Sequence, residues 1–289
     1  MTPLLCLSLL LGCPSSKEPG TTDDSAATTN PTTPTGFDTA LTTPTDEVLR
    51  IDVPARTSDL FGNATFDALR VVLHYRAGAA PNEAAMDRLR EALADLEASG
   101  HVVKPGGIVI ELGKELPASA TANPEYTFEE LDTDLERTRG SFVVGPAAVI
   151  HGLYTDGSYD NGGEGTVLGF AYGGARLVMM RDAIDDACDD PVLGLLPGGA
   201  DEEACAALEA TVLLHELGHL FGLVNNGLPM VSDHQDVDHG AHDDDDGCLM
   251  YWTAETPAVA DTIADAYLGG DGSMPTFDAA CLADMAAAL

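Results

Sequence analysis

The sequence predicts an α/β or α+β domain built on a mixed sheet. Three observations lead to this prediction. Short β-branched runs alternate with amphipathic helical stretches, and the pair Gly173-Gly174 joins two strand-like runs in the manner of a hairpin. A long apolar helical stretch follows them, between residues 201 and 222. No internal repeat is visible, and we place the folded part of the chain at residues 47–289.

The expected elements follow one another in a regular order along the chain. Strands are expected at residues 48–53, 69–75, 107–112, 147–154, 166–172 and 175–181. One helix is expected at 81–100, where apolar residues recur at steps of three and four, and another at 127–139. A third helix begins at Asp201, because acidic residues in its first turn suit the helix dipole, and it ends near Gly222.

The composition excludes several classes of function. The chain has 48 acidic residues against 13 basic ones, for a formal net charge of −35. It has no cluster of Lys and Arg that would bind phosphates, so we expect no nucleic-acid partner. A mean hydropathy of +0.02 excludes a polytopic membrane protein. A strongly anionic surface keeps a protein soluble and favours cationic partners or metal ions, and we expect a monomer.

The first 46 residues are predicted to be targeting and spacer segments. The apolar run Leu4–Leu11 is shorter than the roughly 20 residues that span a bilayer, and it suits a secretory signal. The sequence Leu10-Leu11-Gly12-Cys13 resembles the lipobox of bacterial lipoproteins, which implies a signal peptide at 1–13 and a lipid on Cys13. Residues 14–46 are rich in Thr and Pro and bury too little apolar surface to fold, so they are interpreted as a disordered tether.

This layout predicts an exported lipoprotein of the cell envelope, at the outer membrane or the cell surface. It would meet the membrane only through its N-terminal lipid, and it would be secreted if the lipobox is not used. Four cysteines follow the signal, and an even number in an exported protein suggests disulfides. They allow three pairings, of which the simplest joins sequence neighbours, Cys188–Cys205 and Cys248–Cys281. Zinc ligation by cysteine is the alternative.

The third helix contains the sequence His215-Glu216-Leu217-Gly218-His219. Two histidines four residues apart lie one turn apart on the same helix face, so both imidazoles can reach a single cation. Neutral imidazole is a preferred zinc ligand, and a catalytic zinc site keeps one position for water. Because Glu216 is next to the first ligand, we expect it to act as the general base that activates the zinc-bound water.

With Gly222 the motif extends to His-Glu-x-x-His-x-x-Gly, which resembles the metzincin zinc peptidases. In that family a third ligand follows three residues after the glycine, where this chain has Asn225. Further along, His242, Cys248 and Met250 reproduce the spacing of the third histidine, a cysteine and a methionine in the archaemetzincin branch. The resemblance implies that His242 is the third ligand, displaced by a 17-residue insertion. It also implies that Met250 lies in the methionine-bearing turn below the metal.

Other side chains of the same loop compete for the third position. His234 and His239 are alternatives, and so is a carboxylate such as Asp233 or Asp238. The run Asp243–Asp246 offers oxygen ligands for calcium. It lacks the spacing of an EF-hand, and a solvated acidic loop is favoured. The histidines outside this loop and the motif are interpreted as ordinary structural residues: His74, His101 and His151.

The metzincin resemblance also implies an architecture and an activity. It implies a mixed, mostly parallel sheet with an antiparallel edge strand, two packing helices and an active-site helix, followed by a loop-rich C-terminal subdomain. The run Gly169–Tyr172 looks like the edge strand on which such enzymes bind an extended peptide. The implied function is a metallopeptidase with one catalytic zinc, hydrolysing peptide or protein substrates at the cell envelope. An aminopeptidase or amidase is one alternative. A non-catalytic zinc-containing surface binding protein is another, which would have no use for Glu216.

Overall fold

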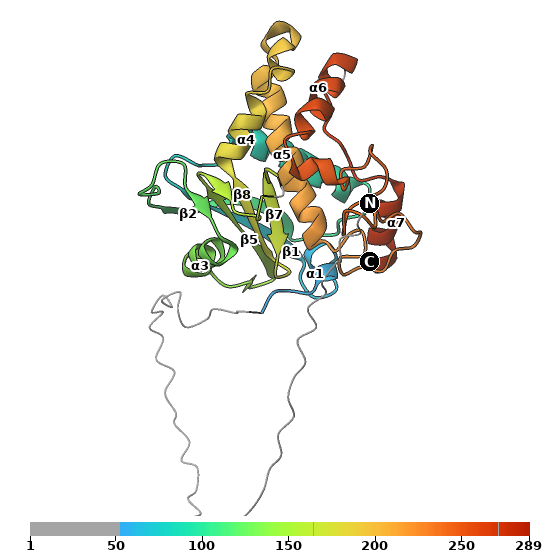
Figure 1. Ribbon diagram of the computed structural model, residues 1–289. Helices are drawn as coiled ribbons and strands as arrows, with labels where there is room; N and C mark the ends of the chain where they lie inside the picture. Colours follow the sequence, from blue (N-terminus) through green and yellow to red (C-terminus); the bar gives the residue numbers. More distant parts are fainter. Residues whose placement is uncertain (1–52, 164, 271) are drawn as a thin grey trace, which may run out of the picture. The chain divides into compact units, whose positions relative to one another are not determined.

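The computed structural model describes residues 53–163, 165–270 and 272–289 (Figure 1). The predicted signal peptide at 1–13, the lipid site at Cys13 and the tether at 14–46 lie outside the described residues, and so does most of the strand expected at 48–53. Among the described residues, no helix is long and apolar enough to cross a bilayer.

A mostly parallel sheet lies at the centre of the described chain, with the strand order β2-β1-β5-β8-β7. These strands are β1 (Ala68–Arg76), β2 (Gly107–Leu116), β5 (Ala147–Thr155), β7 (Gly169–Tyr172) and β8 (Arg176–Met180). β2, β1, β5 and β8 pair in parallel, whereas β7 pairs antiparallel with β8 at the edge. Gly173 and Gly174 close that hairpin with φ of 57° and 76°, a region that favours glycine. The predicted mixed sheet with an antiparallel edge strand is confirmed.

Shorter strands and the helices complete the fold. The short strands are β3 (Glu125–Tyr126), β4 (Val143–Val144) and β6 (Ser158–Tyr159). The helices are α1 (Thr57–Phe61), α2 (Glu83–Ala98), α3 (Phe128–Thr138), α4 (Arg181–Cys188), α5 (Asp201–Leu220), α6 (Val259–Gly269) and α7 (Ala279–Ala288). The 3-10 turns are η1 (Leu193–Leu195), η2 (Pro197–Gly199) and η3 (Trp252–Glu255). The expected helices at 81–100, 127–139 and 201–222 correspond to α2, α3 and α5.

The helix starts follow from their capping residues, and one predicted boundary was wrong. The Asn82 side chain accepts a hydrogen bond from the second residue of α2, and Thr127 and Glu130 form a reciprocal capping box at α3. The strand expected at 175–181 ends at Met180 instead, because Arg181 begins α4, a helix that we did not predict. Helices α6 and α7 were likewise unexpected in a region predicted to be rich in loops.

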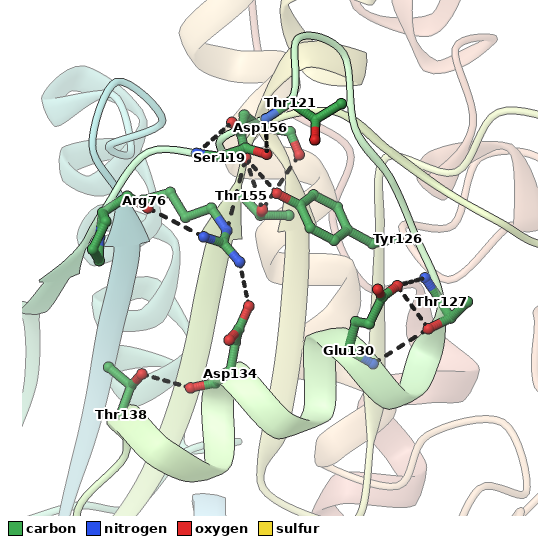
Figure 2. A network of polar contacts seen from close by, with 11 residues as sticks. Arg76, Ser119, Thr121, Tyr126, Thr127, Glu130, Asp134, Thr138, Thr155 and Asp156 are labelled. Carbon is green, nitrogen blue, oxygen red and sulfur yellow. Dashed lines mark hydrogen bonds and ion pairs between the residues drawn. The ribbon is translucent and has the colours of Figure 1, made fainter.

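α3 is held against the end of the sheet by a network of polar contacts (Figure 2). Arg76, the last residue of β1, forms an ion pair with Asp134 of α3 and lies 3.8 Å from the carboxylate of Asp156. The Tyr126 hydroxyl donates a hydrogen bond of 2.9 Å to the same Asp156 carboxylate. These contacts join the last residue of β1 and the residue after β5 to α3 and β3, so they fix the chain at the carboxyl ends of these strands.

α5 is the central helix of the fold and carries the candidate site (Figure 1). It contacts α2, α4, α6 and β7, and nearly every residue from Ala204 onwards is buried. Ala206 and Ala210 pack on Ala85 of α2, where small side chains let the two helices approach closely. The buried Glu209 carboxylate accepts hydrogen bonds from the Arg181 guanidinium and, at 3.0 Å, from the backbone N–H of Asn82. These contacts fix α5 to the start of α4 and the start of α2.

A disulfide joins Cys188 at the end of α4 to Cys205 in the first turns of α5, which confirms one predicted pair. It closes a segment that contains η1 and η2, and the two cysteines are 17 positions apart in the sequence. Cross-linking of this kind stabilises a fold mainly by restricting the unfolded chain. The disulfide therefore adds a covalent tie to the polar contacts that position α5.

A buried histidine pair connects β1 and β5. His74 Nε2 lies 3.3 Å from His151 Nδ1, and the His74 Nδ1 accepts a hydrogen bond of 2.9 Å from the backbone N–H of Lys114. Burial lowers the pKa of His74 to about 4, and the nearby His151 and Lys114 act in the same direction. His74 is therefore neutral in the folded protein at neutral pH.

We expect the folding stability to decrease as the pH falls from about 6.5 to 4. In this window the unfolded chain protonates His74 and the folded chain does not, so acid favours unfolding. The part of the unfolding free energy that depends on neutral His74 is fully present above pH 6.5. At most about 3 kcal/mol of it is lost between pH 6.5 and pH 4. The free energy of unfolding in urea, measured at pH 7 and at pH 4.5, should differ less in His74→Gln than in wild type. The other titrating groups are the same in both proteins, so their contributions cancel when the two differences are compared. An unchanged difference between the two pH values would contradict the assignment to His74.

Candidate metal centre

Two histidines of the predicted motif face each other at the end of α5. The Nε2 atoms of His215 and His219 are 3.1 Å apart, and their rings lie edge to face at 4.7 Å between centroids. His215 Nδ1 donates a hydrogen bond of 2.8 Å to the Leu249 carbonyl, which leaves Nε2 as the free lone pair. Two imidazole nitrogens turned toward one another in this way suit a shared cation.

His242 brings a third imidazole to the same place. Its ring is stacked on His215 at 5.2 Å and lies edge to face with His219 at 5.0 Å. His242 Nδ1 donates a hydrogen bond of 2.7 Å to the His239 carbonyl. The buried Nε2 atom has no hydrogen-bond partner within the described part of the chain. A buried, unpaired nitrogen is costly, and a metal ion is one ligand that would satisfy it.

The competing histidines are engaged elsewhere. The imidazole of His234 lies between two buried carboxylates, 2.7 Å from Asp243 and 3.0 Å from Asp284, so both of its ring nitrogens are occupied. Burial opposes protonation, but the two carboxylates outweigh it and raise the pKa of His234. The exposed ring of His239 stacks on Trp252 at 4.5 Å between centroids, away from the three clustered imidazoles.

The remaining alternatives also lie away from the cluster. The Asn225 side-chain amide donates to the Gln235 side chain at 3.2 Å. Asp233 and Asp238 are exposed, and neither belongs to a metal-binding group of the described residues. The structure therefore brings His242 to His215 and His219.

The exit of the chain from α5 depends on Gly222. Its φ is 81°, and a Cβ at this position would overlap the Thr57 side chain and crowd the backbone nitrogen of Leu228. The following Val224 and Asn225 also have positive φ, of 51° and 60°. This sharp departure from the helix starts the loop that returns with His242.

The return of that loop is fixed by the turn at Met250. The backbone N–H of Asp243 donates a hydrogen bond of 2.9 Å to the Met250 carbonyl, which places the neighbouring His242 beside this turn. Met250 in turn packs under the helix, where a Cβ on Gly218 would overlap its sulfur and contact Phe277. Glycine at the fourth position of His-Glu-Leu-Gly-His therefore allows the close approach of Met250 below the site.

Glu216 is fully buried next to the first histidine. Neither carboxylate oxygen has a hydrogen-bond partner within the described residues. Burial, followed by the negative charge of Glu255, raises the pKa of Glu216 well above its usual value. A carboxylate with an elevated pKa in a desolvated site is suited to accepting and returning a proton.

Glu255, at the end of η3, is a site residue that the sequence analysis missed. One carboxylate oxygen lies 3.6 Å from His242 Nε2 and the other 3.9 Å from His215 Nε2. One donor atom from each of His215, His219, His242 and Glu255 lies within 4.8 Å of the others. No part of the motif marks Glu255, and its only sequence signal is that it follows Met250 by five residues.

The second predicted disulfide was not found. The Cys248 and Cys281 thiols are both buried, but their Sγ atoms are 3.9 Å apart, whereas a disulfide bond is about 2.0 Å long. The Cys281 thiol lies instead 3.5 Å from the Asp243 carboxylate. A second group of possible metal ligands consists of His234, Asp243, Asp278 and Cys281. One donor atom from each of them lies within 4.8 Å of the others. Its histidine is already hydrogen-bonded on both nitrogens.

Calcium, the less favoured interpretation of Asp243–Asp246, finds no support, because Asp244, Asp245 and Asp246 belong to no metal-binding group of the described residues. Asp243 is buried, and its oxygens accept hydrogen bonds from His234 and from the backbone N–H of Asp245. The other three side chains are exposed. The run is therefore an acidic loop with one inward-facing residue.

The three clustered imidazoles fit a zinc ion. Burial lowers the pKa of His215 to about 4, although Glu255 acts in the opposite direction. Burial, with additional effects from His215 and His242, lowers the pKa of His219 well below 6.5. Burial opposes protonation of His242 as well, but the neighbouring Glu255 carboxylate outweighs it and raises the pKa of His242. Zinc prefers neutral imidazole ligands, and three histidines correspond to the protein ligands of a catalytic zinc site.

Comparisons with known proteins give distant structural likenesses only. No family model and no curated protein sequence matches the chain. An archaemetzincin from Methanopyrus kandleri is similar with a TM-score of 0.47 and 18% identity, over 77% of this chain and 96% of that one. An archaemetzincin from Archaeoglobus fulgidus, complexed with malonate, has a TM-score of 0.40 and 14% identity, over 74% and 99%. Metalloproteinase-II from Bacteroides fragilis has a TM-score of 0.40 and 15% identity, over 84% and 57%.

Proposed function

We propose that this protein is a zinc-dependent metallopeptidase in which Glu216 is the general base. The observation that carries the proposal is the convergence of three imidazoles beside a buried carboxylate that has no hydrogen-bond partner among the described residues. When bound, zinc would supply a Lewis acid that polarises a carbonyl and lowers the pKa of water.

Each residue of the site has a distinct role in this proposal. His215, His219 and His242 would hold the metal through Nε2. Backbone carbonyls keep the Nδ1 proton of the first and the third in place. Glu216 would take a proton from the attacking water and deliver it to the leaving amine, a role that its elevated pKa favours.

The edge strand β7 is the proposed substrate-binding element. It packs against α5, the helix that carries Glu216. A strand with one unpaired edge can add an extended peptide by main-chain hydrogen bonds, which favours peptide substrates over small molecules. The aminopeptidase and amidase alternatives share the chemistry and differ in how the substrate is placed.

The metal tests this proposal. We expect about one zinc per chain, and we expect its removal by 1,10-phenanthroline to abolish hydrolysis of a mixed library of quenched fluorescent peptides. Added zinc should restore the activity, and circular dichroism should show that the metal-free protein is still folded. Full hydrolysis by the metal-free protein would refute the proposal, and a zinc-bound protein that cleaves no peptide would favour the binding-protein alternative. Cleavage of peptides with a blocked amino terminus would exclude the aminopeptidase alternative.

We also propose that the enzyme acts at the cell envelope, anchored by a lipid on Cys13. This proposal depends on the lipobox-like sequence and the Thr/Pro-rich segment after it. The full-length protein should incorporate a fatty-acid analogue when it is made in a bacterial host, and Cys13→Ser should not. Equal labelling of the two proteins would show that the lipid, if present, is elsewhere.

A further inference from the structure

We propose that Glu255 is a fourth ligand of the same metal and that it holds the resting site closed. The inference depends on the proposed function, because it needs a metal bound by the three histidines. It adds an internal restraint on activity that the His-Glu-x-x-His motif does not contain.

The position of the Glu255 carboxylate carries this inference. In a tetrahedral zinc site the ligand atoms lie about 3.3 Å from each other. One Glu255 oxygen lies 3.6 Å from His242 Nε2 and the other lies 3.9 Å from His215 Nε2, so the carboxylate group stands near the position of a fourth corner. One donor atom from each of the three histidines and from Glu255 lies within 4.8 Å of the other three.

The surroundings of Glu255 also call for a cation. Among the described residues, the only ion pairs of its side chain are with His215 and His242, and no Lys or Arg contacts it. Both nitrogens that face Glu255 belong to candidate ligands of the metal. A carboxylate aimed at this place is best compensated by a metal ion between it and the imidazoles.

The backbone of Glu255 is fixed while its side chain remains accessible. The Glu255 carbonyl accepts a hydrogen bond of 2.9 Å from the backbone N–H of Leu168, the residue before β7. The side chain is 27% exposed, whereas Glu216 is fully buried. The carboxylate can therefore leave the site by side-chain rotation, without unfolding of η3. Because Glu255 is bonded to the start of β7, a peptide that adds to this strand would approach the same carboxylate.

A fourth protein ligand changes what the metal site can do. Structural zinc sites are closed by four protein ligands, whereas catalytic sites keep one position for water or substrate. With Glu255 bound, the site would be closed. Removal of this carboxylate should therefore weaken metal binding and at the same time open the position that catalysis needs.

Cobalt substitution tests the inference independently of activity. The proteins to compare are wild type, Glu255→Gln, Glu255→Ala and, as a matched control, Asp261→Asn, which removes an exposed carboxylate of the nearby α6. We expect Glu255→Ala to lower the zinc affinity at least about tenfold in chelator competition. We also expect it to change the visible absorption of the Co²⁺ protein, as a solvent ligand replaces the carboxylate. Added acetate should restore the wild-type spectrum in Glu255→Ala, and the control should behave as wild type.

The activity of the same proteins gives the second measurement. At saturating zinc, Glu255→Ala should have a higher kcat per bound metal than wild type. Unchanged affinity and an unchanged cobalt spectrum in both Glu255 variants would overturn the inference and leave the proposed function intact. A lower kcat with an unchanged spectrum would also overturn it, because Glu255 would then handle a proton instead of the metal. Failure of the wild-type protein to bind zinc or cobalt would refute the proposed function itself. Urea unfolding of the metal-free proteins shows whether each variant is folded, because a folded variant unfolds cooperatively like wild type.

Discussion

Glu216→Gln should reduce peptide hydrolysis by about 10³-fold and leave zinc binding intact. The reduction lies within the range of about 10²–10⁴-fold that general acid–base catalysis contributes. Glutamine has nearly the shape of glutamate but accepts no proton, and Glu216 lies beside the candidate ligands without belonging to their group. Its carboxylate is also fully buried with no hydrogen-bond partner among the described residues, so the substitution breaks no structural contact there.

The measurement is kcat/KM on a cleaved peptide, together with the zinc content of the same sample. Glu202→Gln is a suitable control, because it makes the same chemical change at an exposed position in the first turn of α5. If Glu216→Gln were fully active, the assignment of the base would be wrong. Loss of zinc from this variant would instead make Glu216 a ligand.

His242→Ala should lower the zinc affinity by more than about 100-fold, which exceeds the 10–100-fold cost of losing an outer-shell partner. The reason is that His242 supplies the third Nε2 of the cluster, and the alternatives in the same loop are held by other groups. His239→Ala should keep the affinity of wild type. It removes an exposed ring and leaves the backbone carbonyl that accepts from His242.

Competition with a chromogenic chelator measures both affinities under the same conditions. Retention of zinc by His242→Ala, with loss of zinc from His239→Ala, would reverse the assignment. The hydrolase proposal would survive that result, since two histidines of α5 and Glu216 would remain. Loss from both variants would indicate that the loop, and not one side chain, determines metal binding.

The part of the site that lies on one helix could be predicted from spacing alone. His215 and His219 are one helical turn apart, and this relation is independent of the rest of the fold. The edge strand could also be predicted from a short piece of sequence, because the two adjacent glycines indicate the hairpin that it forms with the next strand. The order of the sheet strands, by contrast, comes from packing that no short motif records.

The choice among the loop histidines could not be made from the residues alone. His234 is excluded by Asp243 and by Asp284, and the second of these is 50 residues away and lies on α7, a helix that was not predicted. Glu255 was missed for a similar reason. Its carboxylate reaches the site because η3 and its hydrogen bond to Leu168 place it there, and an isolated glutamate after the methionine carries no distinctive pattern.

The return of the chain at Asp243 and Met250 has a consequence for how such proteins diverge. The third imidazole is positioned by short-range bonds: its Nδ1 donates to the His239 carbonyl, and the Asp243 N–H next to it donates to the Met250 carbonyl. A change of length between Gly222 and His234 would therefore leave these bonds in place. A search pattern that fixes the distance from the glycine to the last ligand will overlook every relative in which this stretch has grown or shrunk. A pattern that counts backwards from the methionine will retain them.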